Sequence, residues 1–119
     1  MSTAELDREL NQMILAGNGF PAAFDRFYAD DVLMHEANGV ICEGKEANRQ
    51  REQAALAHME FHESQLVHAA VNGDVTFSEW RYDATMGGQR MTLEQVARRV
   101  WKDGKVVHER FYYNYAAPA

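Results

Sequence analysis

The first apolar stripe along the chain has the spacing of an amphipathic α-helix. It consists of Leu6, Leu10, Met13 and Ile14. Ser2 and Glu5 have capping-box spacing ahead of it, and Gly17 and Gly19 favour its end. Pro21 suits the first turn of a second helix. The buried face expected for this second helix comprises Phe20, Phe24, Phe27 and Tyr28.

A short hairpin and a third helix are predicted next. Residues 31–36 read as a strand, Asn38-Gly39 as a turn and residues 40–42 as a return strand. Residues 44–58 are predicted as a helix from propensity, with only modest apolar periodicity.

From about residue 60 the pattern changes to long strands separated by glycine turns. The strands are expected at residues 67–71, 75–86, 91–101 and 106–115, with turns at Asn72-Gly73, Gly87-Gly88 and Lys102-Asp103-Gly104. Three helices followed by a four-strand antiparallel meander indicate an α+β fold. The 119 residues suit one domain, residues 1–119.

Two orientations stay open. In residues 75–86, apolarity favours Trp80 and Tyr82 facing inward, whereas the opposite face would bury Glu79 and Asp83. In the last hairpin, a type I turn over Lys102-Asp103 with Gly104 as a bulge places Gln95, Arg99 and Trp101 beside Glu109. A two-residue turn would place Arg98 there instead. The bulged turn is the preferred interpretation.

Composition narrows the range of partners. The formal charge is −6, from 12 Lys+Arg against 18 Asp+Glu, so binding to a nucleic acid is not expected. Cys42 is the only cysteine, which excludes an intrachain disulfide. The polar N-terminus does not resemble a signal peptide, and no run of about 18 apolar residues could span a membrane. A cytoplasmic location is therefore expected.

Four segments carry a resemblance to a known superfamily. They are FYADDVLMHEANG (27–39), GKE (44–46), VNGDV (71–75) and VWKDGKVVHERFYYN (100–114). The chain resembles the nuclear transport factor 2-like superfamily, which includes SnoaL-like polyketide cyclases and ketosteroid isomerases. The resemblance implies a cone: three N-terminal helices packed into a strongly curved, mainly antiparallel sheet, with an interior pocket for a small apolar or aromatic molecule. It implies no cofactor.

The resemblance also proposes site residues. The catalytic base of ketosteroid isomerases falls on Glu36, and a carboxylate at an apolar rim gains a raised pKa suited to proton transfer. The isomerase tyrosine falls on Gln12, and its protonated aspartic acid near Ala97 or Val96. An authentic ketosteroid isomerase is therefore not expected. Glu109 is the expected second catalytic carboxylate. The substrate-binding set is Gln12, Met34, Arg99, Trp101, Phe111 and Tyr113.

Two functional interpretations follow from these residues. One is a cofactor-independent isomerase, cyclase or hydratase/hydrolase acting on a small apolar or polycyclic substrate. The other is a non-catalytic ligand-binding or dimerisation domain of the same fold. No metal site is expected, although His58, Glu60 and His62 would share a side in an extended segment. A homodimer through the outer sheet face is expected, with Val96, Val100 and Tyr112 as its apolar patch.

Overall fold

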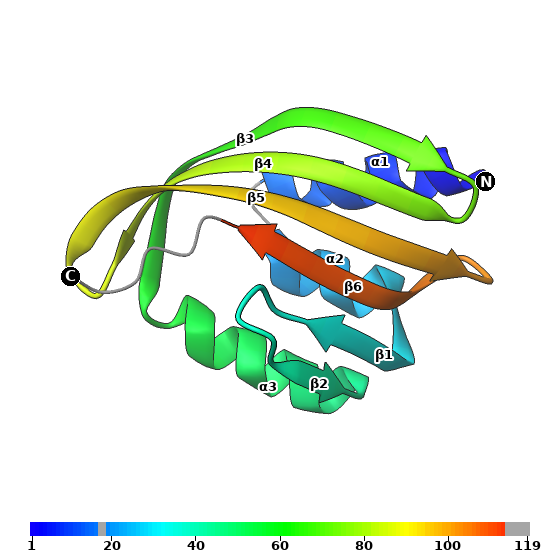
Figure 1. Ribbon diagram of the computed structural model, residues 1–119, viewed down its shortest axis with the longest axis horizontal. Coiled ribbons are helices and arrows are strands. Elements are labelled where there is room, and N and C mark those ends of the chain that lie inside the picture. The colour runs from blue at the N-terminus through cyan, green and yellow to red at the C-terminus, as the bar shows by residue number, and fades with distance from the viewer. Residues whose placement is uncertain (17–18, 114–119) are drawn as a thin grey trace.

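A curled six-stranded sheet wraps around helices in the computed structural model, which describes residues 1–16 and 19–113 (Figure 1). The elements are α1 (Thr3–Leu15), α2 (Gly19–Phe27), β1 (Tyr28–His35), β2 (Ile41–Glu43), α3 (Lys45–Leu56), β3 (Met59–Asn72), β4 (Val75–Met86), β5 (Gln89–Lys102) and β6 (Lys105–Tyr113). The strand order is β2-β1-β6-β5-β4-β3. Among the strand pairs formed by the described residues, only β1–β6 is parallel. The predicted α+β cone is confirmed, as a curled sheet that does not close.

The N-terminal helix forms as its pattern predicts. The Ser2 hydroxyl accepts a hydrogen bond from the Glu5 amide at 3.2 Å, and the Glu5 carboxylate accepts one from the Ser2 amide at 3.3 Å, completing the capping box. Leu10 is fully buried on the inner face of α1, but Asp7 and Asn11 are buried beside it. The inner face of α1 is therefore partly polar. The predicted helix stop at Gly17 lies outside the described residues.

Several element boundaries differ from the prediction. β1 begins at Tyr28, directly after α2, and β3 extends back to Met59. The third helix ends at Leu56, and its buried residue is Asn48, whose Nδ2 donates to the carbonyl oxygens of Gly44 at 2.8 Å and Cys42 at 2.9 Å. This amide fixes the start of α3 against β2. The inner face of α3 is therefore polar at Asn48, which explains the weak apolar periodicity of its sequence.

The last hairpin combines features of both predicted registers. Asp103 and Gly104 have φ values of 52° and 76°, and Lys102 pairs with Lys105, so the turn has two residues and the predicted turn over Lys102-Asp103 is wrong.

A bulge follows in β6, because Val100 pairs with His108 whereas Trp101 pairs with Val106. The extra residue restores the alternation that sets Arg99 opposite Glu109. It also buries Val106 on the inner face, where the uninterrupted alternation would have placed Val107.

The orientation of β4 follows apolarity. Trp80 and Ala84 are buried on the inner face, whereas Glu79 and Asp83 point outward. Asp83 accepts two hydrogen bonds from Arg90, at 3.0 and 2.8 Å. The acidic interior that the opposite orientation would have produced is therefore absent from this part of the described sheet.

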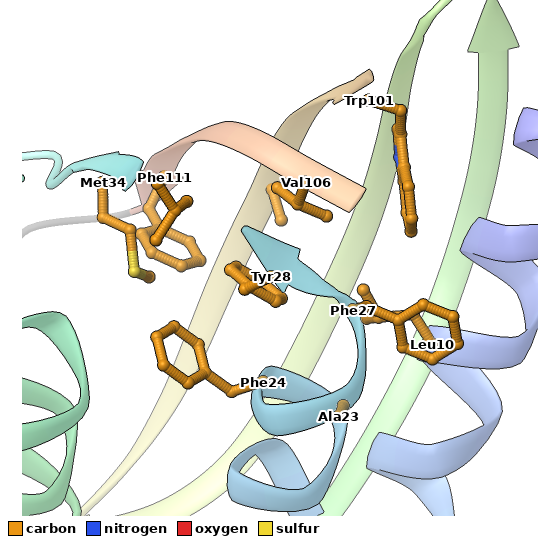
Figure 2. Close-up of a cluster of buried hydrophobic side chains, with 11 residues drawn as sticks. Leu10, Ala23, Phe24, Phe27, Tyr28, Met34, Trp101, Val106 and Phe111 are labelled. Carbon is orange, nitrogen blue, oxygen red and sulfur yellow. The ribbon is translucent and has the colours of Figure 1, made fainter. Parts of the chain in front are cut away.

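Helices and sheet meet in a core rich in aromatic side chains (Figure 2). Tyr28 lies among the core side chains at the centre of the view, and its ring is 4.7 Å from that of Phe24. Trp101 packs edge-on against Phe27, with ring centroids 6.0 Å apart. Three residues predicted to contact substrate thus belong to the hydrophobic core: Met34, Trp101 and Phe111.

Candidate functional site

A buried arginine organises the interior of the sheet. Arg99, on β5, is 2% exposed, and its Nε donates to Glu109 Oε2 at 2.7 Å. Its Nη1 donates to Asp7 Oδ1 at 2.9 Å and to Asn11 Oδ1 at 2.8 Å. The side chain therefore ties α1 to β5 and β6, and it lies between two buried carboxylates.

The Asp7 side of this network is fully engaged. Asp7 Oδ1 also accepts from the Thr76 hydroxyl at 2.8 Å, and that hydroxyl accepts from Trp101 Nε1 at 2.9 Å. Asn11 Nδ2 donates to Ser78 Oγ at 2.9 Å. Buried polar groups that satisfy one another in this way fix the position of a helix against a sheet. We assign this half of the network a structural role.

The Glu109 side is not fully engaged. Glu109 is fully buried, yet its Oε1 makes no hydrogen bond of normal length and angle with a described residue, and neither does the hydroxyl of the buried Tyr28. The two groups are nevertheless close enough to interact, and this interaction opposes the rise that burial causes in the pKa of Glu109 and adds to that of Tyr28. An unsatisfied buried polar group costs about 1–3 kcal/mol. Burial raises the pKa of Glu109, and the charge of Arg99 opposes that rise. Burial and the charge of Glu109 raise the pKa of Tyr28.

Two further carboxylates, Glu36 and Glu52, belong to the same electrostatic group, because Glu36 and Glu109 both act on the pKa of Glu52. Glu36 follows β1, and its Oε1 accepts from Arg51 Nη2 at 2.7 Å, with the Glu36 side chain 15% exposed. Glu52, one residue further along α3, is 22% exposed and lies 3.7 Å from Arg51. Burial, followed by the charges of Glu36 and Glu109, raises the pKa of Glu52 to about 7. We call Tyr28, Glu36, Arg51, Glu52 and Glu109 the inner cluster.

The structure brings only some of the predicted residues together. Glu36, Glu109 and Arg99 face the interior, and Met34 is the cross-strand partner of Glu109. Gln12 is exposed on the far side of α1, in a hollow of about 300 Å³ with Glu9, Met13, Ala16 and Arg26. It does not join the inner cluster. Tyr113, the last described residue, packs against the core.

Sequence reasoning missed the polar residues of the helices. Asp7 and Asn11 lie one helical turn apart within the apolar stripe of α1, and Asn48 and Glu52 have the same spacing on α3. Residues four apart share a helix face, so these two polar pairs were detectable signals for buried or functional groups.

Other features of the described residues lie apart from the inner cluster. A hollow of about 410 Å³ on the outer sheet face is lined by Glu63, Gln65, Arg81, Asp83, Arg90, Met91 and Thr92. Within residues 1–16 and 19–113, no three or more His, Cys, Asp or Glu side chains are grouped to hold a metal ion. No described helix combines the length and apolarity needed to cross a membrane. An interior pocket remains a prediction.

Comparisons with known proteins agree with the fold. The model of the SnoaL-like domain matches residues 9–109. One similar structure is a protein from Mesorhizobium loti described as a SnoaL-like polyketide cyclase, with carbohydrate phosphatase given in brackets. The two sequences are 31% identical, the TM-score is 0.88, and the match covers 95% of this chain and 100% of that chain. No curated protein sequence matches the chain.

Two more distant structures share the fold alone. One, from Catenulispora acidiphila, has a ketosteroid isomerase-like fold and was solved with trimethylamine; it is 20% identical, with a TM-score of 0.74 and coverage of 88% of this chain and 85% of that chain. The other is an epoxide hydrolase from M. tuberculosis, 15% identical, with a TM-score of 0.71 and coverage of 89% and 80%. Because the family model spans most of the chain, this protein belongs to the SnoaL-like domain family.

Proposed function

We propose that the inner cluster is a small-molecule site that performs acid–base chemistry without a cofactor, with Glu109 as the central proton-transfer group. One observation carries this proposal. Glu109 is fully buried with Oε2 fixed by Arg99 at 2.7 Å, while Oε1 has no partner among the described residues. A carboxylate that is positioned through one oxygen and free at the other suits proton transfer to a bound molecule.

The neighbouring groups supply the remaining functions. Glu52 is partly exposed and has a pKa of about 7, so it exchanges protons with solvent near neutral pH. Glu36 is held by Arg51 at the end of β1 and contacts the ligand from there. The Tyr28 hydroxyl, lacking a partner in the described structure, donates to a ligand oxygen. Reactions open to this set are proton transfer beside a carbonyl, ring closure, dehydration and epoxide hydration.

The competing function is ligand binding without catalysis. Distant structures illustrate both possibilities, since one is an epoxide hydrolase and another was solved with trimethylamine. Binding of an uncharged ligand alone gives no reason for a buried carboxylate to keep one oxygen without a donor, because a neutral amide would serve at lower desolvation cost. This argument favours the enzyme.

Proton abstraction is testable without knowing the natural substrate. A panel of small ketones in D2O, followed by proton NMR, is expected to include compounds whose α-protons exchange faster with wild-type protein. Glu109→Gln is expected to slow that exchange roughly 100-fold or more, the range of a lost general base. Glu79→Gln, on the outer sheet face, is the matched control and should exchange as wild type does. Equal exchange by Glu109→Gln and wild type would remove Glu109 from this chemistry.

We also propose a homodimer through the outer face of β5 and β6. Tyr112 is 43% exposed there, on the same face as Val96 and Val100. Light scattering coupled to gel filtration should give a dimer mass for wild type and a monomer mass for Tyr112→Lys. Val71→Lys, at an exposed site on the edge strand β3, is the control and should stay dimeric. A monomeric wild type at micromolar concentration would contradict this proposal.

A further inference from the structure

The charged groups on the inner side of the sheet do not balance. Four carboxylates face two guanidinium groups: Asp7, Glu36, Glu52 and Glu109 against Arg51 and Arg99. If all were ionised, the interior would carry two uncompensated negative charges. Uncompensated charge is costly in a poorly solvated interior, so these carboxyl groups either stay protonated or gain a counter-charge.

Both guanidinium groups are already committed. Arg99 donates to Glu109 Oε2, Asp7 and Asn11, and Arg51 donates to Glu36 at 2.7 Å. Glu109 Oε1 remains without a donor, although the residue is fully buried. The Tyr28 phenol influences the pKa of this carboxylate but makes no hydrogen bond of normal geometry with Oε1, so this buried oxygen can accept a further donor.

One aromatic side chain of a ring cluster, Tyr82, lies within electrostatic range of the same carboxylate. Tyr82 lies on the inner face of β4, and burial raises the pKa of its phenol; the charge of Arg99 opposes this rise and that of Glu109 adds to it. Its ring stacks on Trp80 with centroids 5.7 Å apart and meets Phe61 edge-on at 5.3 Å. Carboxylates combined with aromatic faces are the chemistry that recognises organic ammonium groups.

We propose that the inner cluster binds a small organic cation, in which an ammonium group carried on an apolar body donates to Glu109 Oε1. This inference deepens the proposed function and rests on the inner cluster being the ligand site. The ammonium supplies both the missing donor and the missing charge. A divalent metal is disfavoured by the arrangement of donors, since the described residues contain no grouping of three or more metal-binding side chains.

The charge balance also predicts proton release. Burial and the negative charges of Glu36 and Glu109 raise the pKa of Glu52, and the positive charge of Arg51 opposes this rise. Phenols of Tyr28 and Tyr82 and the guanidinium of Arg99 lie around Glu109 itself. A bound ammonium favours the ionised form of Glu52, so binding at pH 7 should expel a fraction of a proton.

Three isosteric probes differing in charge test the inference. Benzylammonium, benzyl alcohol and benzoate share a phenyl ring, and their substituents carry charges of +1, 0 and −1. Calorimetry at pH 7 should show benzylammonium binding roughly tenfold or more tighter than benzyl alcohol, and benzoate binding weakest. Repeating the titration in buffers of different ionisation enthalpy should reveal proton release by wild type. Release should be smaller in Glu52→Gln, where Glu109, whose pKa is also raised, remains as a source of protons.

Variants separate the cation inference from the site itself. Glu109→Gln should lose the preference for benzylammonium over benzyl alcohol, and Glu79→Gln should keep it. Glu109→Gln also disturbs Arg99, so Tyr28→Phe provides a milder probe. It should weaken the binding of benzyl alcohol and keep the preference for benzylammonium over benzyl alcohol. Equal affinity for all three probes, or tighter binding of benzoate, would overturn the inference while leaving a ligand site. Failure of all three to bind would overturn the inference and count against the site as well.

Discussion

Replacing Arg99 with methionine is expected to destabilise the protein by about 3–5 kcal/mol, because it leaves two buried carboxylates without their counter-charge. Methionine fills much of the volume of the arginine stem, so the loss comes from Asp7 and Glu109 rather than from a cavity. Urea unfolding monitored by tryptophan fluorescence measures the change, since Trp80 and Trp101 are buried.

Arg90→Met is the matched control. It breaks the two hydrogen bonds from Arg90 to Asp83, but that pair is exposed and should contribute little. Arg99→Met/Glu109→Gln should recover part of the lost stability, because the second change removes one stranded charge. A loss for Arg99→Met no larger than that for Arg90→Met would show that the interior network is not needed for stability.

Glu52→Gln is expected to stabilise the protein above neutral pH by up to about 3 kcal/mol. The reason is that folding raises the pKa of Glu52 from 4.5 to about 7, so keeping this carboxylate ionised at higher pH costs folding free energy. A carboxyl with a raised folded-state pKa contributes stability that is fully present below pH 4.5 and is lost as pH rises through 7. The free energy of unfolding of the wild-type protein should therefore fall between pH 5 and pH 8. Glu52→Gln should show much less of this weakening.

Urea unfolding at several pH values between 5 and 8 tests the sign as well as the size. Glu43→Gln, at an exposed position of β2, should follow the wild-type pH dependence. Glu109 has a raised pKa too, so some pH dependence of the same sign should remain in Glu52→Gln. Parallel curves for wild type and Glu52→Gln would mean that Glu52 does not ionise near neutrality in the folded protein.

Local patterns predicted the elements, but not every connection. The capping box at Ser2 and Glu5 and the glycine turns are short-range signals, and the structure contains them. The bulge at Val107 depends on how β6 fits against β5 and on which side chains the interior accepts, neither of which is encoded in the turn residues. Two errors of register, one in the turn and one in the strand, cancel to leave Arg99 opposite Glu109.

The site was less predictable for a related reason. Strand alternation together with the family resemblance predicts Glu36, Glu109 and Arg99 as inward residues, and the structure places them there. Asp7 and Glu52 come from helices, where only their spacing of four from Asn11 and Asn48 distinguishes them from surface residues before the helix is docked. Gln12 was placed by analogy with another sequence, and its neighbour Asn11 occupies the interior instead. A one-residue rotation on a helix, about 100°, separates the two.

The central claim is that ligands bind at the inner cluster, and chemical-shift mapping with benzylammonium tests it most directly. Protein labelled at backbone amides and glutamate carboxyl groups should show its largest changes at Glu52, Glu109 and Tyr28. Changes confined to the outer hollow around Glu63, Arg81 and Arg90, or no saturable change at any residue, would contradict the claim.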